Sequence, residues 1–281
     1  MKLVTAHGST LDCNRGGSRV VGILNLSADS FSGDGIRDMQ SRVNQILLAE
    51  ADMIDVGAES TRPGAREMDP AAEKALVVPA VRYLRQVCSL PISVDTRKAV
   101  VADAALTEGA NIINDVSGLK FDPEMIHVAA RHKAGVVLSH SRGTPETMQD
   151  PENLKYDDVT EDVITFFRTQ MEYAVSQGVT REQILLDPGI GFAKNTEQNL
   201  ELIRNCEVFR KTFDRPVFYG VSRKSFLGEI TQVTNPAERD FATVAAITWL
   251  AAHHADFLRV HNVRGARDAV TVSSHLMKGK E

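Results

Sequence analysis

The chain has 281 residues, of which 43% are hydrophobic and 25% charged, as in an ordinary globular protein with one large core. Its formal net charge of −5 gives no broad basic surface for nucleic acid or for an anionic membrane. No run of about 18 apolar residues occurs, so the sequence predicts no membrane span.

The cysteines and the start of the chain point to a reducing compartment. Cys13, Cys88 and Cys206 are odd in number, far apart and outside any CxxC spacing. This pattern argues against a disulfide framework and against a structural zinc site. No apolar block of about 7–15 residues follows Lys2, so no signal peptide is predicted. We expect a soluble cytoplasmic protein.

Eight short apolar runs, rich in Val, Ile and Leu, recur along the chain. They cover residues 20–25, 53–57, 91–95, 111–115, 134–140, 184–187, 216–221 and 256–261. Runs that are apolar almost throughout are typical of parallel strands buried on both faces.

Helical patterns separate these runs. Several helix starts are marked by a capping side chain, in three cases followed by proline: Asp69-Pro70, Asp122-Pro123, Asn235-Pro236, and Asn195 with Gln198. Apolar residues at three- and four-residue steps from 159 to 174 predict one helix with a core-facing stripe. The alternation favours an α/β fold, a (β/α)8 TIM barrel in a single domain over 20–281. An open doubly wound sheet is the alternative, and residues 1–19 form a short N-terminal extension for which a hairpin is one interpretation.

Each apolar run ends in polar or ionisable residues. These are Asn25, Asp55, Asp95, Asn114 with Asp115, His140, Asp187, Ser222 to Lys224, and Arg259 with His261. In a barrel, the carboxyl ends of the strands build the active site. A single Asp there could be only the N-cap of the next helix, but capping is a poor explanation for all eight runs. We therefore expect these side chains to converge on one face.

The residue types at the strand ends suggest the ligand. Asp and Asn together present acceptors and donors that suit a flat heterocycle with amide and amino groups, such as a pterin or a purine. Cations at Arg62, Arg223, Lys224, Arg259 and His261, in a chain of net negative charge, indicate an anion, which we take to be phosphate.

Two weaker interpretations concern single motifs. Gly189-Ile190-Gly191 lacks the third glycine and the later acidic residue of a dinucleotide site, so a turn is the better interpretation. Arg259 and His261, two residues apart on one strand, should meet one anion. The alternative is that one of them only pairs with a neighbour such as Asp256.

Seven motifs together resemble the dihydropteroate synthase family. They are VGILNLSADSF (21–31), DVGAESTRPG (55–64), SVDTRK (93–98), NDVSG (114–118), LDPGIGFAK (186–194), GVSRKSFLG (220–228) and LRVHNVRG (258–265). Some also occur in related pterin-binding methyltransferases, whereas ESTRPG with SRKSFLG is more specific to the synthases. The resemblance implies a transferase of folate synthesis that joins 6-hydroxymethyl-7,8-dihydropterin pyrophosphate to p-aminobenzoate and releases pyrophosphate.

The resemblance also implies roles for individual residues. It places the pterin at Asp95, Asn114, Asp187 and Lys224, and p-aminobenzoate at Thr61, Pro63, Phe192, Lys224 and Ser225. It places the pyrophosphate at Asn25, Arg62, Arg259 and His261, with Asn25 also a ligand of Mg²⁺. Asp95, Lys224 and Arg259 are the implied catalytic residues. Loops after Asn25, including Phe31, and around Arg62 would close over the substrates, and a homodimer is implied.

Four departures from the family pattern set this chain apart. It has Ser27-Ala28 for Thr-Pro, Ser139 and Ser141 on either side of His140 for two methionines, Ala193 for Gly and Asn262 for Asp. None removes a residue to which a direct role is assigned. Three other functions remain open at this point: a folate-dependent methyltransferase, an aldolase with Lys224 as Schiff-base nucleophile, and a pterin-binding paralogue without catalysis.

Overall fold

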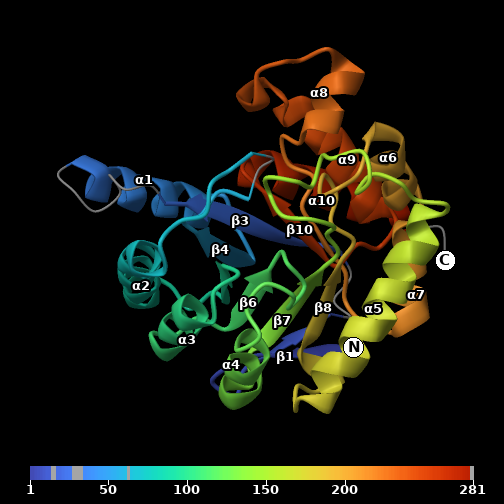
Figure 1. Ribbon diagram of the computed structural model, residues 1–281. Helices are drawn as coiled ribbons and strands as arrows, with labels where there is room; N and C mark the ends of the chain where they lie inside the picture. The colour runs from blue at the N-terminus through green and yellow to red at the C-terminus, as the bar shows by residue number, and fades with distance from the viewer. Residues whose placement is uncertain (14–16, 27–33, 62–63, 279–281) are drawn as a thin grey trace.

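The computed structural model describes residues 1–13, 17–26, 34–61 and 64–278 of the chain, with only the backbone for 34–36. Its centre is a barrel of eight parallel strands (Figure 1). The strands are β3 (Arg19–Asn25), β4 (Met53–Gly57), β5 (Ile92–Asp95), β6 (Ile112–Asp115), β7 (Gly135–Ser139), β8 (Ile184–Asp187), β9 (Phe218–Tyr219) and β10 (Phe257–Val260). The (β/α)8 barrel predicted from the sequence is confirmed.

The barrel closes between β8 and β9. Hydrogen-bonded strands follow the order β8-β7-β6-β5-β4-β3-β10-β9. A parallel bridge joins Leu186 to Val217, and the Leu186 amide donates to the Pro216 carbonyl at 2.9 Å. This contact brings the two ends of the sheet together, so the open doubly wound alternative is wrong. Some strands are shorter than the predicted runs, because residues such as His140 and His261 already lie in the loops at the strand ends.

Helices surround the strands (Figure 1). They are α1 (Asp34–Leu48), α2 (Pro70–Val87), α3 (Ala99–Thr107), α4 (Met125–His132), α5 (Val159–Ser176), α6 (Thr196–Arg204), α7 (Cys206–Phe213), α8 (Ser225–Thr231), α9 (Asp240–Ala252) and α10 (Val263–Met277), with short 3-10 turns η2 (Arg181–Gln183) and η3 (Pro236–Glu238). The predicted stripe of α5 is buried at Val159, Val163, Phe167, Met171 and Ala174. Its burial against the barrel is what holds the helix in place.

Most predicted caps are present. The Asp69 side chain accepts from the amides of Ala71 and Ala72, and Asn195 with Gln198 forms a reciprocal capping box. Asp122 is different, because α4 begins only at Met125. Its carboxylate accepts from the Ala99 amide of α3 at 2.8 Å and so ties two neighbouring helices together.

The N-terminal residues cover the amino-terminal end of the barrel. Strands β1 (Lys2–Val4) and β2 (Thr10–Asp12) form an antiparallel hairpin. Leu3 of this hairpin is fully buried and packs in one cluster with inward-facing residues of seven strands: Val21, Met53, Ile112, Val137, Leu185, Phe218 and Phe257. The hairpin therefore covers the amino-terminal end of the barrel, and the carboxyl-terminal end is left for a site.

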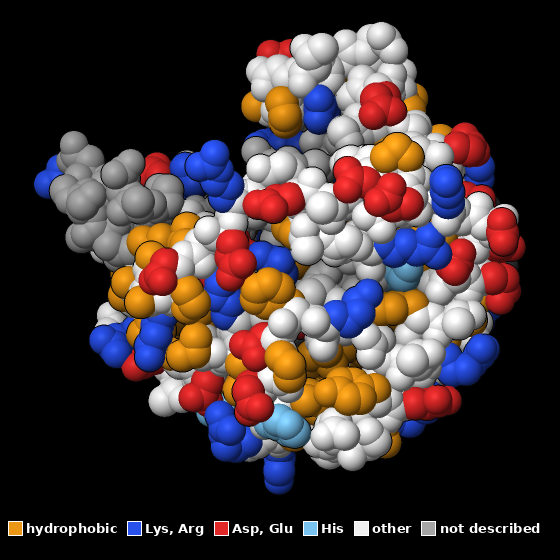
Figure 2. All heavy atoms as spheres, viewed as in Figure 1, with side chains coloured by type: hydrophobic (Ala, Val, Ile, Leu, Met, Phe, Trp, Pro, Cys, Tyr) orange, Lys and Arg blue, Asp and Glu red, His pale blue; other side chains and the backbone are white. Residues whose placement is uncertain are grey.

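The surface supports the inference drawn from the net charge. On the face shown in Figure 2, Lys and Arg side chains are interspersed with Asp and Glu, and no continuous basic area appears. No helix in the described part of the chain has the length and apolar character needed to cross a membrane.

Candidate active site

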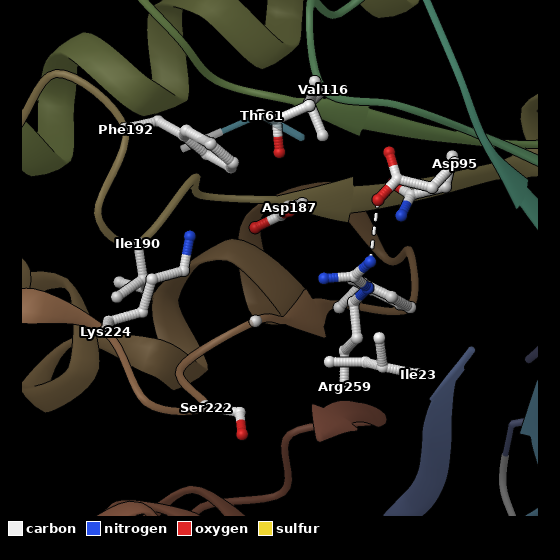
Figure 3. Close-up of a pocket in the computed structure, with 13 residues that line it drawn as sticks. Ile23, Thr61, Asp95, Val116, Asp187, Ile190, Phe192, Ser222, Lys224 and Arg259 are labelled. Carbon is white, nitrogen blue, oxygen red and sulfur yellow. Dashed lines mark hydrogen bonds and ion pairs between the residues drawn. The ribbon is translucent and has the colours of Figure 1, made fainter. Parts of the chain in front are cut away.

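A cavity at the carboxyl ends of the strands gathers most of the predicted site residues (Figure 3). Its polar lining comes from six of the eight strand ends and loops: Thr61, Asp95, Asn114, Asp187, Ser222, Lys224 and Arg259. Apolar walls are supplied by Ile23, Val116, Ile190, Phe192 and Phe218. The cavity therefore combines an apolar slot with a few convergent polar groups, as expected of a small-molecule site.

Asp187 ends β8 and lies at the centre of this cavity (Figure 3). Its Oδ1 accepts from the Gly189 amide at 2.8 Å, and its Oδ2 accepts from the Ser139 hydroxyl at 3.1 Å. Burial raises the pKa of Asp187, while these hydrogen bonds and Lys224 oppose that rise. The carboxylate is thus fixed in one orientation before a ligand arrives.

Asn114 provides an acceptor with no internal partner. Its Nδ2 donates to Asp55 at 3.2 Å, whereas its Oδ1 is buried and has no hydrogen bond within the described part of the protein. A buried acceptor without a donor costs free energy, so such a group is expected to meet a donor on a ligand. Asn114 and Asp187 therefore both line the cavity, and each contributes oxygen acceptors to it.

Arg259 is held by two carboxylates inside the barrel. Its Nε donates to Asp55 at 2.5 Å, and its Nη2 donates to Asp95 at 2.7 Å. Burial raises the pKa of Asp95 to about 7, although Arg259 opposes this. The remaining guanidinium nitrogen points towards the centre of the cavity in Figure 3. Asp256, the alternative partner for this residue, instead pairs with Arg210.

Lys224 and Phe192 form the other side of the cavity. The Lys224 ammonium lies 4.0 Å from the centroid of the Phe192 ring, a cation–π contact. The two residues come from different loops, after β9 and after β8. A cation above an aromatic wall suits a flat ligand that carries an anionic group.

Arg223 has a different role from the one that its position in the sequence suggests. Its backbone is left-handed, with φ of 60°, and its guanidinium forms a two-pronged ion pair with Asp240 of α9 at 2.7 and 2.9 Å. Arg239 donates to the carbonyls of Arg223 and Lys224. These contacts anchor the loop that carries Lys224, and Arg223 does not line the central cavity.

The structure separates Asn25 and His261 from Arg259. Asn25 and His261 line a second cavity, which shares Ile23 with the first and also contains Arg42 and Arg223. The His261 ring bonds to the Ser222 hydroxyl at 2.9 Å. The predicted ligand-binding residues at the strand ends therefore divide between two cavities. Five line the central cavity, namely Asp95, Asn114, Asp187, Lys224 and Arg259, and two line the adjoining one, namely Asn25 and His261.

The remaining predicted residues differ in position. Thr61 lines the central cavity, whereas Ser225 is exposed at the first position of α8. Arg62, Pro63 and Phe31 lie outside the described residues. His140 is buried behind the cavity, where its Nδ1 meets the Lys194 ammonium at 2.9 Å.

Lys194 is a buried cation that the strand-end reasoning missed. Its ammonium also donates to the carbonyls of Gly189 at 3.1 Å and Phe192 at 3.0 Å. Burial lowers the pKa of Lys194 to about 7. Because its ammonium bonds the carbonyls of both Gly189 and Phe192, Lys194 fixes the loop that carries the Phe192 wall of the cavity.

A second buried network supports the loop that carries Thr61. The Glu59 carboxylate accepts from Arg97, from Lys98 and, at 2.8 Å, from the Met68 amide. Lys98 also donates to the buried Glu73 of α2 at 2.6 Å. Burial opposes ionisation of Glu59, but the hydrogen bonds from Lys98 and Arg97 hold its pKa below the ordinary value. Nothing in the sequence beyond the ESTRPG and SVDTRK motifs pointed to this pairing.

Comparison with known proteins agrees with this geometry. Residues 21–261 match the family described as pterin binding enzyme. The chain is 42% identical to the dihydropteroate synthase of Synechocystis sp., over 92% of this chain and 90% of that protein. It is 38% identical to the Escherichia coli dihydropteroate synthase, over 100% of this chain and 98% of that protein.

The fold comparison gives the same result. The crystal structure of Yersinia pestis dihydropteroate synthase with a sulfonamide drug superimposes with a TM-score of 0.91 at 36% identity, covering 99% of this chain and all of that one (100%). The chain belongs to the dihydropteroate synthase family. It is therefore a transferase of folate synthesis, and the family predicted from its motifs is confirmed.

Proposed function

We propose that the central cavity holds the pterin of 6-hydroxymethyl-7,8-dihydropterin pyrophosphate beside p-aminobenzoate and joins the two, with release of pyrophosphate. The observation that carries this proposal is that the two ends of one cavity differ in chemical character. One end is the hydrogen-bonding edge of Asp187 and Asn114, and the other is the cation–aromatic pair of Lys224 and Phe192.

The pterin occupies the Asp187 end of the cavity. An ionised Asp187 accepts from two adjacent donors, the ring N–H and the amino group, while the orphan Oδ1 of Asn114 accepts from a further N–H. Asp95 and Arg259 border the same space and contact the edge of the ring that bears the reacting carbon. Lys224 donates to an acceptor on the pterin.

The p-aminobenzoate ring lies against Phe192 and Thr61, with its carboxylate near the start of α8, where Ser225 supplies a hydroxyl and an amide. The family resemblance implies that Pro63, which lies outside the described residues, borders the same subsite. A similar structure, that of Xanthomonas albilineans dihydropteroate synthase, contains 4-aminobenzoic acid. A flat anion between an aromatic wall and a helix start agrees with the physical character of this end.

The pyrophosphate is directed to the adjoining cavity, which Asn25 and His261 line. Arg259 supplies a cation from the central cavity, and the family resemblance implies a second cation from Arg62, which lies outside the described residues. The described residues contain no cluster of three His, Cys, Asp or Glu side chains that could hold a metal alone. Mg²⁺ is usually bound by one or two protein oxygens together with substrate phosphates, and the single amide oxygen of Asn25 fits that mode. Bound there, the ion would neutralise the leaving diphosphate.

The protein's own side chains position the two substrates and stabilise the charges that develop during the reaction. Loss of pyrophosphate from the pterin methylene leaves positive charge conjugated with the ring. An ionised Asp95 stabilises that charge, and Arg259 stabilises the charge that collects on the departing group. The amine of p-aminobenzoate then needs only to be held against the methylene carbon, so no covalent nucleophile takes part.

A pyrophosphate-release assay tests the proposal. With the pterin pyrophosphate and Mg²⁺, release should be fast only when p-aminobenzoate is added, and 7,8-dihydropteroate should appear in equal amount. Release that is absent with both substrates would indicate a pterin-binding protein without catalysis. Trapping of a pterin-independent carbonyl substrate by borohydride on Lys224 would indicate an aldolase instead.

The assembly and location of the chain are also proposed. The apolar side chains of Phe241, Trp249 and Leu276 on α9 and α10 are 91%, 46% and 69% exposed, which supports a homodimer formed through these helices. All three cysteines are free thiols, which supports a cytoplasmic location.

A further inference from the structure

The two oxygens of Asp187 are each occupied by one internal donor. The Gly189 amide donates to Oδ1 at 2.8 Å, and the Ser139 hydroxyl donates to Oδ2 at 3.1 Å. Ser139 is the last residue of β7 and pairs in register with Asp187 on β8, so the two side chains lie on the same side of the sheet. Ser139 is fully buried.

These two bonds leave a defined pair of acceptor sites. An ionised carboxylate has about four lone-pair positions, two on each oxygen. With one position on each oxygen taken by an internal donor, one on each remains for a ligand in the cavity that Asp187 lines. Two adjacent donors, such as a ring N–H beside an amino group, match this arrangement.

We propose that Ser139 is a positioning residue that fixes the carboxylate plane of Asp187 and thereby sets the affinity for the pterin ring. The inference rests on the proposed function, in which Asp187 meets the pterin. Without the Ser139 hydroxyl only one oxygen stays anchored, and the carboxylate rotates about its χ2 bond, a soft torsion in Asp. The hydroxyl also favours the ionised carboxylate in a site where burial opposes ionisation.

The effect should be confined to the pterin half of the cavity. Ser139 and Asp187 lie on β7 and β8, whereas the Phe192 carbonyl is held by the Lys194 ammonium and not by the Ser139 hydroxyl, which donates to Asp187. Loss of the hydroxyl should therefore leave the p-aminobenzoate subsite unchanged. If Ser139 had only a structural role, its replacement would lower the stability of the protein and weaken the binding of both substrates together.

The test compares Ser139→Ala with Ser141→Ala. Ser141 is also buried, two residues further on, and its hydroxyl makes no hydrogen bond with Asp187. Calorimetric titration with 6-hydroxymethylpterin, which lacks the pyrophosphate, gives the pterin Kd, and steady-state kinetics give the KM for p-aminobenzoate. We expect Ser139→Ala to weaken pterin binding about 5- to 20-fold without changing the KM for p-aminobenzoate, and Ser141→Ala to change neither.

Asp187→Asn in the same titration separates this inference from the proposed function. If Asp187→Asn weakens pterin binding but Ser139→Ala binds like the wild type, the Ser139 inference is wrong and the pterin assignment stands. If neither variant changes the Kd, the pterin assignment itself is wrong. Equal losses in Ser139→Ala and Ser141→Ala would also overturn the inference, because they would indicate general disturbance of this segment.

Discussion

Arg259 on β10 donates to the Asp95 carboxylate on β5 at 2.7 Å, across the open end of the barrel (Figure 3). The Nε of the same guanidinium donates to the Asp55 carboxylate on β4. Because Asp55 holds one nitrogen and Asp95 another, the cation is oriented before substrate binds. This arrangement places a cation in the wall of the central cavity, which shares Ile23 with the adjoining cavity of Asn25 and His261.

Removing this cation should slow the chemical step more than it weakens binding of the pterin ring. In the proposed mechanism Arg259 counters charge that grows on the leaving pyrophosphate. Arg259→Ala should therefore raise the barrier by roughly 2–4 kcal/mol, or about 30- to 1,000-fold in single-turnover rate. Arg204→Ala, which breaks an exposed pair with Glu197, is the matched control and should react at the wild-type rate. A wild-type rate in Arg259→Ala, or a defect limited to p-aminobenzoate affinity, would contradict the assignment.

The rate should depend on pH through Asp95. Its pKa is raised to about 7, chiefly by burial, with Asp55 and Glu73 adding to the rise and Arg259 and Lys224 opposing it. Only the ionised carboxylate stabilises a developing cation, so the single-turnover rate should increase with pH and reach half its maximum near pH 7. Asp95→Asn should be slow at every pH and show no such rise. A rise of the same shape in Asp95→Asn would assign the titration to another group.

Lys194 should matter for p-aminobenzoate although it lies behind the cavity. Its ammonium joins His140 to the carbonyls of Gly189 and Phe192. Lys194→Met removes all three hydrogen bonds, so the Phe192 wall should loosen and the KM for p-aminobenzoate should rise about tenfold. Lys120→Met is the control, because Lys120 donates to the Ser141 carbonyl outside this loop. A larger effect on the pterin Kd than on the KM for p-aminobenzoate would argue against the role.

Glu59 should stabilise the fold in a pH-dependent way. Its pKa is held below the ordinary value of 4.5 by Lys98 and Arg97 despite burial, so its contribution is present above that value and is lost as pH falls through the lowered pKa. At neutral pH, Glu59→Gln leaves the buried Arg97 without its carboxylate and Lys98 with Glu73 alone, and should lower the free energy of unfolding by about 3 kcal/mol. Urea melts should show that the difference in the free energy of unfolding between Glu59→Gln and the wild type becomes smaller at acid pH. The exposed Glu197→Gln should change stability by less than about 0.5 kcal/mol, and a pH-independent difference for Glu59→Gln would refute the account.

The sequence predicted those features of the fold that depend on one strand at a time. Apolar runs such as those ending in Asp95 and Asp187 predicted parallel strands, and the barrel rule placed their polar ends together. It could not resolve which neighbours each side chain meets. Arg259 and His261 are two residues apart in the sequence, yet the first reaches inward to Asp95 while the second bonds to Ser222 beside another cavity.

Long-range pairings between buried polar groups were the main gap. Ser139 with Asp187, Lys194 with His140, and Glu59 with Lys98 join residues 39 to 54 positions apart. No local periodicity or capping pattern encodes such contacts, because they depend on how neighbouring strands and loops are juxtaposed in three dimensions. The loss of two methionines around His140 was visible in the sequence, but the hydrogen bond that Ser139 makes was not.

The central claim is that one cavity holds the pterin at Asp187 and Asn114 and the benzoate ring at Phe192 and Lys224. A crystal structure of this chain with 7,8-dihydropteroate tests it most directly. We expect the pterin ring within hydrogen-bond distance of the Asp187 carboxylate and of the Asn114 Oδ1, with the benzoate ring against Phe192. Product bound in the reverse orientation, or in a different cavity with Asp187 and Asn114 untouched, would contradict the account.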